Sequence, residues 1–202
     1  IYVIRHATQA FAKVILDEGE EAAKKGVAIC RDCRNNGKEF AEAAACVMAA
    51  NGIPVRIFKD MRPTPELSFA VRHYGCIAGI NVTASHNPKE YNGYKVYWSD
   101  GAQLPPAHAA KIAAVMENSD MFTSVKTMDY NEAVDAGLIT VMGRETDDAF
   151  LENVLAQSGK WSDDELDRNV NIVYTPFHGT GCTLIPEVLK SIGVNNLYCV
   201  EE

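Results

Sequence analysis

The side chains with the clearest capacity for chemistry lie in one polar loop near the middle of the chain. An apolar run over residues 77–82 leads into this loop, which contains Ser85 and His86, and Lys95 lies on the strand expected over residues 94–98. Because ligands of open α/β sheets bind beyond the carboxyl ends of the strands, a loop in this position is a candidate active site.

A serine hydrolase is the first chemistry that this loop suggests, and we disfavour it. A serine hydroxyl is a poor nucleophile unless a base or a metal activates it. His86 is badly placed as that base, because neighbouring side chains in an extended loop point apart. The flanks of Ser85 also lack the G-x-S-x-G turn of the α/β-hydrolases.

A serine that carries a phosphoryl group fits the loop better. Backbone amides, His86, a lysine and a divalent cation could together position a phosphate on Ser85. The period of a strand places Lys95 on the same face as Tyr97, and close enough to the loop to take part. The alternative role of Lys95, an edge-strand lysine that prevents aggregation, stays open.

Helices and strands that alternate along the chain must position this loop. Helical spacing of apolar residues predicts helices over residues 4–19, 39–50, 65–74, 107–116, 131–136, 147–156 and 184–192. Apolar runs bounded by turn residues predict strands over residues 27–30, 55–58, 76–83, 94–98, 102–104, 170–174 and 197–200. This order predicts a three-layer α/β/α fold with a mixed, mainly parallel sheet and an antiparallel edge hairpin, followed by the start of a second α/β domain.

Some local features are expected from single residues. Thr64 is of a type that caps helices, with Pro65 in the first helical position. His6 is expected to be a solvated residue of the first helix. Residues 119–145 have no regular pattern apart from the helix over 131–136.

The chain is expected to contain one whole domain and the beginning of a second. We expect a first domain over residues 1–145 with the serine loop, a linker helix and boundary over 146–168, and an incomplete second domain over 169–202. The last of these contains a single βαβ unit, which cannot bury both faces of its own sheet. We therefore expect a homodimer or other self-association of this chain.

Composition excludes several classes of function. A formal charge of −8, from 27 acidic and 19 basic residues, argues against a nucleic-acid partner, which requires a basic face. No apolar run approaches the roughly 20 residues needed to cross a bilayer. The six cysteines fall mostly in apolar patterns, which predicts reduced, mostly buried thiols and a cytoplasmic protein.

The serine loop resembles the phosphoserine loop of the α-D-phosphohexomutases. The resemblance rests on Thr83-Ala-Ser-His-Asn-Pro88, followed by Tyr91-Asn-Gly-Tyr-Lys95. Four further segments resemble the phosphoglucomutase and phosphopentomutase-like branch of that family: Arg5-x-Ala-Thr-Gln9, Asp32-Cys-Arg34, Arg62-Pro-Thr-Pro-Glu-Leu-Ser68 and Thr175-Pro-Phe-His-Gly-Thr-Gly181.

The resemblance implies a sugar phosphate substrate and a phosphoglucomutase or phosphomannomutase activity. Ser85 would carry the phosphoryl group and exchange it with the sugar through a bisphosphorylated intermediate. His86 and Lys95 match family positions that assist proton transfer and orient the reacting groups.

Other residues match family positions with different roles. Five of them would shape the loop rather than react, namely Thr83, Asn87, Pro88, Asn92 and Gly93. A phosphate oxygen on Ser85 would be one ligand of a Mg²⁺ ion, a cation that prefers oxygen ligands in octahedral geometry.

The chain also departs from the family pattern. It lacks the Asp-Gly-Asp-x-Asp-Arg run of the family's metal loop, and Cys33 stands in a serine position. The other Mg²⁺ ligands and the C-terminal partner domains are expected beyond Glu202, so we expect this chain to be inactive alone. A noncatalytic module that binds sugar phosphates or a partner domain is the main alternative.

Overall fold

The computed structural model describes residues 1–158 and 167–201, which form two compact units. The first unit spans Ile1–Met142 and the second spans Gly143–Glu202. The expected boundaries at 145 and 168 stay predictions, and residues 159–166 of the expected linker lie outside the described residues.

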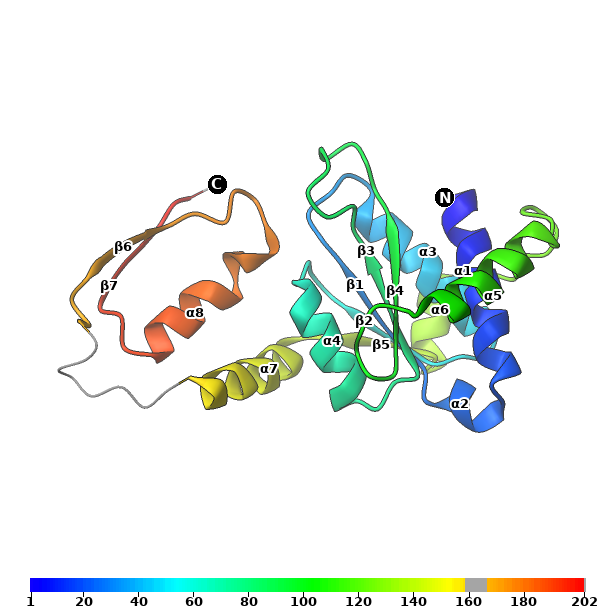
Figure 1. Ribbon diagram of the computed structural model, residues 1–202, viewed down its shortest axis with the longest axis horizontal. Helices are drawn as coiled ribbons and strands as arrows, with labels where there is room; N and C mark the ends of the chain where they lie inside the picture. The colour runs from blue at the N-terminus through cyan, green and yellow to red at the C-terminus, as the bar shows by residue number, and fades with distance from the viewer. Residues whose placement is uncertain (159–166, 202) are drawn as a thin grey trace. The chain divides into compact units, whose positions relative to one another are not determined.

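The first unit is built on a five-stranded sheet with the order β4-β3-β1-β2-β5 (Figure 1). Its strands are β1 (Val27–Arg31), β2 (Val55–Phe58), β3 (Ala78–Val82), β4 (Tyr94–Trp98) and β5 (Ile139–Met142). All neighbouring strands are parallel except β3 and β4, which pair antiparallel. The predicted fold class, a mainly parallel sheet with an antiparallel edge, is therefore confirmed.

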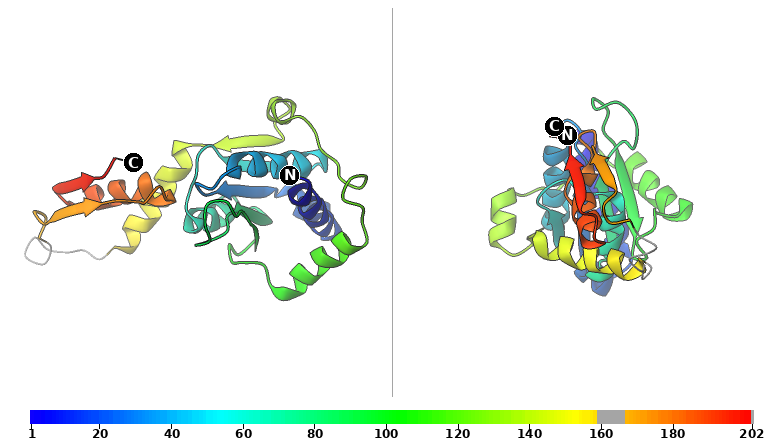
Figure 2. Two further views of the ribbon diagram at one scale, coloured as in Figure 1. Left: turned by 90° about the horizontal axis from the view of Figure 1, so that it is seen from above. Right: turned by 90° about the vertical axis from the view of Figure 1, so that its left-hand side faces the viewer.

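Helices cover both faces of this sheet and make three layers (Figure 2). The helices of the first unit are α1 (Tyr2–Asp17), α2 (Glu20–Lys24), α3 (Gly37–Ala50), α4 (Thr64–His73), α5 (Pro106–Glu117) and α6 (Tyr130–Asp135). The larger core cluster joins α1, α3 and α6 to one face, and α4 buries Leu67, Ala70 and Val71 against the other. Apolar helix stripes thus remove both faces of the inner strands from water.

The alternation predicted for the edge strand β4 is confirmed. Tyr97 packs in the cluster with α4, whereas Tyr94, Val96 and Trp98 pack against the larger cluster on the opposite face. Lys95 therefore lies on the α4 face. The expected return strand over 102–104 is reduced to one bridge between Tyr97 and Gln103.

Strand β5 was missed because its pattern is weak. Only Ile139 and Met142, its end residues, are buried, while Val141 is 42% exposed. A four-residue edge strand with this pattern has neither the alternation nor the apolar run that sequence reasoning uses.

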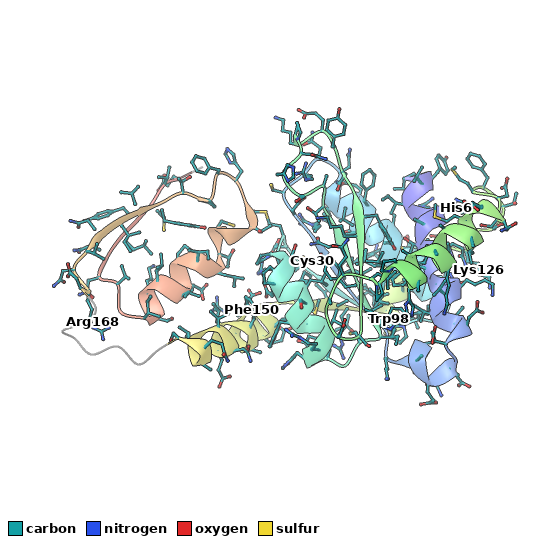
Figure 3. All side chains as sticks on the ribbon, in the orientation of Figure 1. His6, Cys30, Trp98, Lys126, Phe150 and Arg168 are labelled. Carbon is teal, nitrogen blue, oxygen red and sulfur yellow. The ribbon has the colours of Figure 1, made fainter. Side chains whose placement is uncertain are left out.

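Three local predictions were wrong. His6 is buried rather than solvated, and its Nε2 lies 2.9 Å from the Ser119 hydroxyl, just beyond α5 (Figure 3). Thr64 does not cap α4, because Pro63 occupies that position and the Thr64 hydroxyl instead accepts a 2.9 Å bond from the Asn81 amide.

The third concerns the cysteines, of which half are exposed. Cys30, Cys46 and Cys76 are buried, whereas Cys33, Cys182 and Cys199 are exposed, and all six are free thiols. Burial raises the pKa of Cys30 to about 12 and that of Cys76 to about 11, so both stay protonated near neutral pH.

The second unit contains helix α7 (Arg144–Gln157), strands β6 (Asn171–Tyr174) and β7 (Asn196–Cys199), the short helix η1 (Thr180–Cys182) and helix α8 (Leu184–Ser191). The two strands are parallel, and Val173 lies opposite Tyr198. Both side chains are open to water, at 71% and 58% exposure. Within the described residues this small sheet thus leaves apolar surface uncovered, as expected for a lone βαβ unit.

No helix within residues 1–158 and 167–201 combines the length and the hydropathy that a membrane span needs.

Candidate active site

Two loops leave the same end of the sheet from adjacent strands. Strand β1 leads into α3 on one face, whereas β3 follows α4 on the other, so the chain changes face between these two parallel neighbours. Arg31 is in register with Val82, and the Asp32 amide donates to the Val82 carbonyl at 3.3 Å. Ligands of open α/β sheets bind at such a switch point.

Ser85 occupies a strained position in the loop after β3. The Asn87 amide donates to the Ala84 carbonyl at 3.2 Å, which closes a turn with Ser85 and His86 in its centre. Ser85 is exposed and has a φ of +59°, in the left-handed region. A side chain there costs roughly 1 kcal/mol, and strain of this kind concentrates at functional sites.

Arg34, in the loop after β1, binds three carbonyl oxygens of the serine loop. Its Nη2 donates to Ser85 at 2.7 Å, and its Nη1 donates to Pro88 at 2.6 Å and to Tyr91 at 3.0 Å. Its Nε donates to Asp32 Oδ2 at 3.0 Å, and its side chain is only 7% exposed. Charge-assisted bonds of this length from one planar group hold the loop in register.

Thr83 connects the same carboxylate to Ser85 from the other side. Its buried hydroxyl donates to Asp32 Oδ2 at 2.5 Å and accepts a 3.1 Å bond from the Ser85 amide. Asp32 Oδ1 also accepts from the Arg34 amide at 3.1 Å. The Asp32 carboxylate therefore links the two loops through three hydrogen bonds.

Asn92 and Gly93 close the serine loop. The Asn92 side chain donates to the Asn35 carbonyl at 3.1 Å and accepts from the Gly93 amide at 2.9 Å. The Gly93 carbonyl accepts from the Thr83 amide at 3.2 Å, and a Cβ on Gly93 would lie only 2.5 Å from the Thr83 carbonyl oxygen. These contacts fit the loop-shaping role predicted for both residues.

The remaining predicted site residues are more open. His86, Asn87 and Pro88 are exposed, and Lys95 is partly exposed on β4, opposite Asn81 of β3. Within the described part of the chain, no hydrogen bond joins the Ser85 hydroxyl to His86 or to Lys95. The loop therefore contains no preformed serine–histidine pair of the hydrolase kind.

Sequence reasoning named Asp32 and Arg34 only in one of the segments that carry the family resemblance, without a part in the site. A signal was available: both residues follow an inner strand at the switch point, next to the strand that leads to Ser85. Neither periodicity nor composition could show that an arginine would reach across to three carbonyls.

The described residues do not make a complete magnesium site. They include no cluster of three or more His, Cys, Asp or Glu side chains able to hold a metal ion. The nearest acidic group in the bonded network, Asp32, already accepts bonds from Thr83 and Arg34.

Comparison with known families identifies the family of this chain. Residues 1–122 match the family model described as phosphoglucomutase/phosphomannomutase, alpha/beta/alpha domain I. The chain belongs to the phosphoglucomutase/phosphomannomutase family, the α-D-phosphohexomutases. The match covers β1, β3 and β4, and with them both loops of the candidate site.

Individual members of the family resemble the chain along most of its length. It is 32% identical to a phosphoglucomutase of Staphylococcus haemolyticus over 200 residues, 99% of the chain, and 31% identical to human phosphopentomutase over 195 residues, 93% of the chain. A putative phosphomannomutase of Thermus thermophilus has a similar fold, with a TM-score of 0.77 at 23% identity over 98% of this chain.

The chain spans about a third of the length of these curated relatives. It covers 35% of the staphylococcal protein and 31% of the human one, and 41% of the Thermus structure.

Proposed function

We propose that this chain is the phosphoserine-bearing part of a phosphohexomutase that acts on sugar phosphates, with Ser85 as the temporary phosphoryl carrier. The observation that carries the proposal is an exposed serine in a left-handed turn at the switch point, with its loop held by a buried arginine. A protein accepts the cost of such strain where the geometry serves a function.

The proposed step is an in-line phosphoryl transfer. Phospho-Ser85 donates its phosphoryl group to a free hydroxyl of a sugar monophosphate. The bond from phosphorus to Ser85 Oγ breaks as the bond from phosphorus to the sugar oxygen forms, and the proton of that sugar hydroxyl passes to Ser85 Oγ, with His86 or Lys95 as the relay. The resulting sugar bisphosphate turns over in the site, and its other phosphate returns to Ser85 by the same step in reverse. Both half-reactions depend on positioning more than on covalent chemistry by the protein.

The role of Mg²⁺ is limited by the ligands that the chain offers. A phosphate on Ser85 would supply one oxygen ligand, and the others would come from residues outside the described network. Bound there, the cation would neutralise charge on the transferring group. A cytoplasmic location, as for other proteins with free thiols, is part of the same proposal.

A noncatalytic sugar-phosphate module is the second candidate. It is favoured by the lack of a base bonded to the Ser85 hydroxyl among the described residues and by their lack of a metal cluster. In that case the loop would grip a phosphate ester without accepting its phosphoryl group.

Intact-mass measurement and titration with glucose 1,6-bisphosphate separate the two candidates. Under the carrier proposal, the wild-type chain gains the mass of one phosphoryl group and the Ser85→Ala variant gains none. If both proteins bind the bisphosphate equally and neither is phosphorylated, the carrier proposal is wrong and the binding module is favoured.

A further inference from the structure

We infer that Arg34 and Asp32 are positioning residues for Ser85, which clamp both polar backbone groups of that residue through one ion pair. This inference rests on the proposed function for its effect on phosphoryl transfer, but the clamp itself is a property of the loop.

The clamp holds the amide and the carbonyl of Ser85 through different side chains, and both of these side chains bind the same oxygen of Asp32. The Ser85 amide donates to the Thr83 hydroxyl, and this hydroxyl in turn donates a hydrogen bond to Asp32 Oδ2. The Ser85 carbonyl accepts from Arg34 Nη2, and Arg34 Nε donates to the same Oδ2. One carboxylate oxygen therefore organises the partners on both sides of the strained residue.

Only arginine has the donors for this arrangement. A guanidinium carries five N–H groups in a fixed plane, and four of them bind the carbonyls of Ser85, Pro88 and Tyr91 and the carboxylate of Asp32. Lysine would keep the charge, but its three donors on one atom cannot span the loop in this way.

The clamp acts on the loop more than on the core. Ser85, Pro88 and Tyr91 are exposed, and none of them belongs to either core cluster. Without the clamp, we expect Ser85 to leave its φ of +59°, because extended and right-handed conformations are lower in energy for serine. The hydroxyl would then spend little time in the orientation that the folded loop gives it.

The test measures phosphoryl transfer to Ser85 from glucose 1,6-bisphosphate in the 202-residue chain. We expect Arg34→Met to lower the maximal rate by about a hundredfold, the cost of a misplacement near 1 Å, with the half-saturating concentration changed less than about twofold. Arg34→Lys is expected to recover part of the rate. Arg72→Met, at an exposed arginine of α4, is the charge-matched control and should transfer like the wild type.

A second pair of variants protects the test against misfolding. Thr83→Val removes the hydroxyl at nearly constant shape, whereas Thr83→Ser keeps it. We expect the valine variant to lose rate and the serine variant to retain most of it. Hydrogen exchange over residues 83–93 should speed up in Arg34→Met and Thr83→Val, while the exchange of β1 and β3 stays as in the wild type.

The outcomes separate the two proposals. The clamp is refuted if the wild type accepts phosphate, Arg34→Met does so at a similar rate, and the hydrogen exchange of residues 83–93 is unchanged in that variant. If the wild type accepts no phosphate, the carrier function fails, and loop exchange alone then decides whether Arg34 orders the loop.

Discussion

At the residue scale, a serine occupies a backbone position that suits glycine. The left-handed φ of Ser85 costs the fold free energy, and Arg34 and Thr83 supply the bonds that maintain it. Glycine would fit the backbone without this cost, but it would remove the hydroxyl. The Ser85 side chain is therefore present although the left-handed backbone conformation at this position favours glycine.

The left-handed φ of Ser85 predicts that two substitutions at this position differ in stability. Ser85→Gly should be more stable than Ser85→Ala by about 1 kcal/mol, because alanine keeps the Cβ that the left-handed region disfavours. Urea denaturation of the two variants measures the difference. Equal stability, or a more stable alanine variant, would mean that the turn does not hold Ser85 in the left-handed region.

At the element scale, much of the first unit was predictable. Strands β1 to β4 and the helices around them, apart from the five-residue α2, follow from apolar periodicity and glycine or proline boundaries, because burial on one or two faces imposes those patterns. Strand β2 coincides with the predicted range 55–58. The two-residue period of a strand also predicted which side chains of β4 lie on each face of the sheet.

What could not be predicted depends on contacts between segments distant in sequence. Strand β5 is a strand only because β2 offers it an edge. His6 is buried only because α5 delivers Ser119 beside it. The candidate site shows the same division: the resemblance singled out Ser85, whereas the role of Arg34 required the spatial neighbourhood of β1 and β3.

The pairing of α7 with α8 in the second unit should depend on pH. Arg144 donates to both carboxylate oxygens of Glu187 at 2.6 Å and holds the pKa of that carboxyl below its ordinary value of 4.5. A lowered pKa means that the stabilisation is fully present above about pH 4.5 and is lost as pH falls through the lower value.

Thermal unfolding at two pH values tests this contact. Glu187→Gln should cost less than about 1 kcal/mol near pH 7, as partly exposed ion pairs do, and the difference from wild type should shrink at low pH. Glu152→Gln, at an exposed position of α7, controls for net charge. A cost that grows as the pH falls would contradict the assignment.

At the scale of the whole molecule, the second unit leaves the apolar pair Val173 and Tyr198 in water. A two-stranded sheet is marginal on its own, and apolar surface of this kind favours association. We therefore expect the chain to self-associate as its concentration rises, and Val173→Lys to weaken the association. Sedimentation velocity measures both, and a chain that stays monomeric at high concentration would refute the expectation.

The 202 residues should not complete a mutase cycle alone. They contain no Asp-Gly-Asp-x-Asp-Arg run, and the described residues offer no cluster of metal ligands. A coupled assay should therefore detect no conversion of glucose 1-phosphate to glucose 6-phosphate, even with Mg²⁺ and the bisphosphate present. Steady turnover by the purified chain would show that the missing groups are not needed.

The most direct test of the account locates the phosphoryl group that the chain accepts from a sugar bisphosphate. The chain is incubated with glucose 1,6-bisphosphate, and the phosphate is then located by peptide mass spectrometry. We predict that the phosphate resides on Ser85. Phosphate on another residue, or a chain that stays unmodified, would contradict a carrier role for this serine.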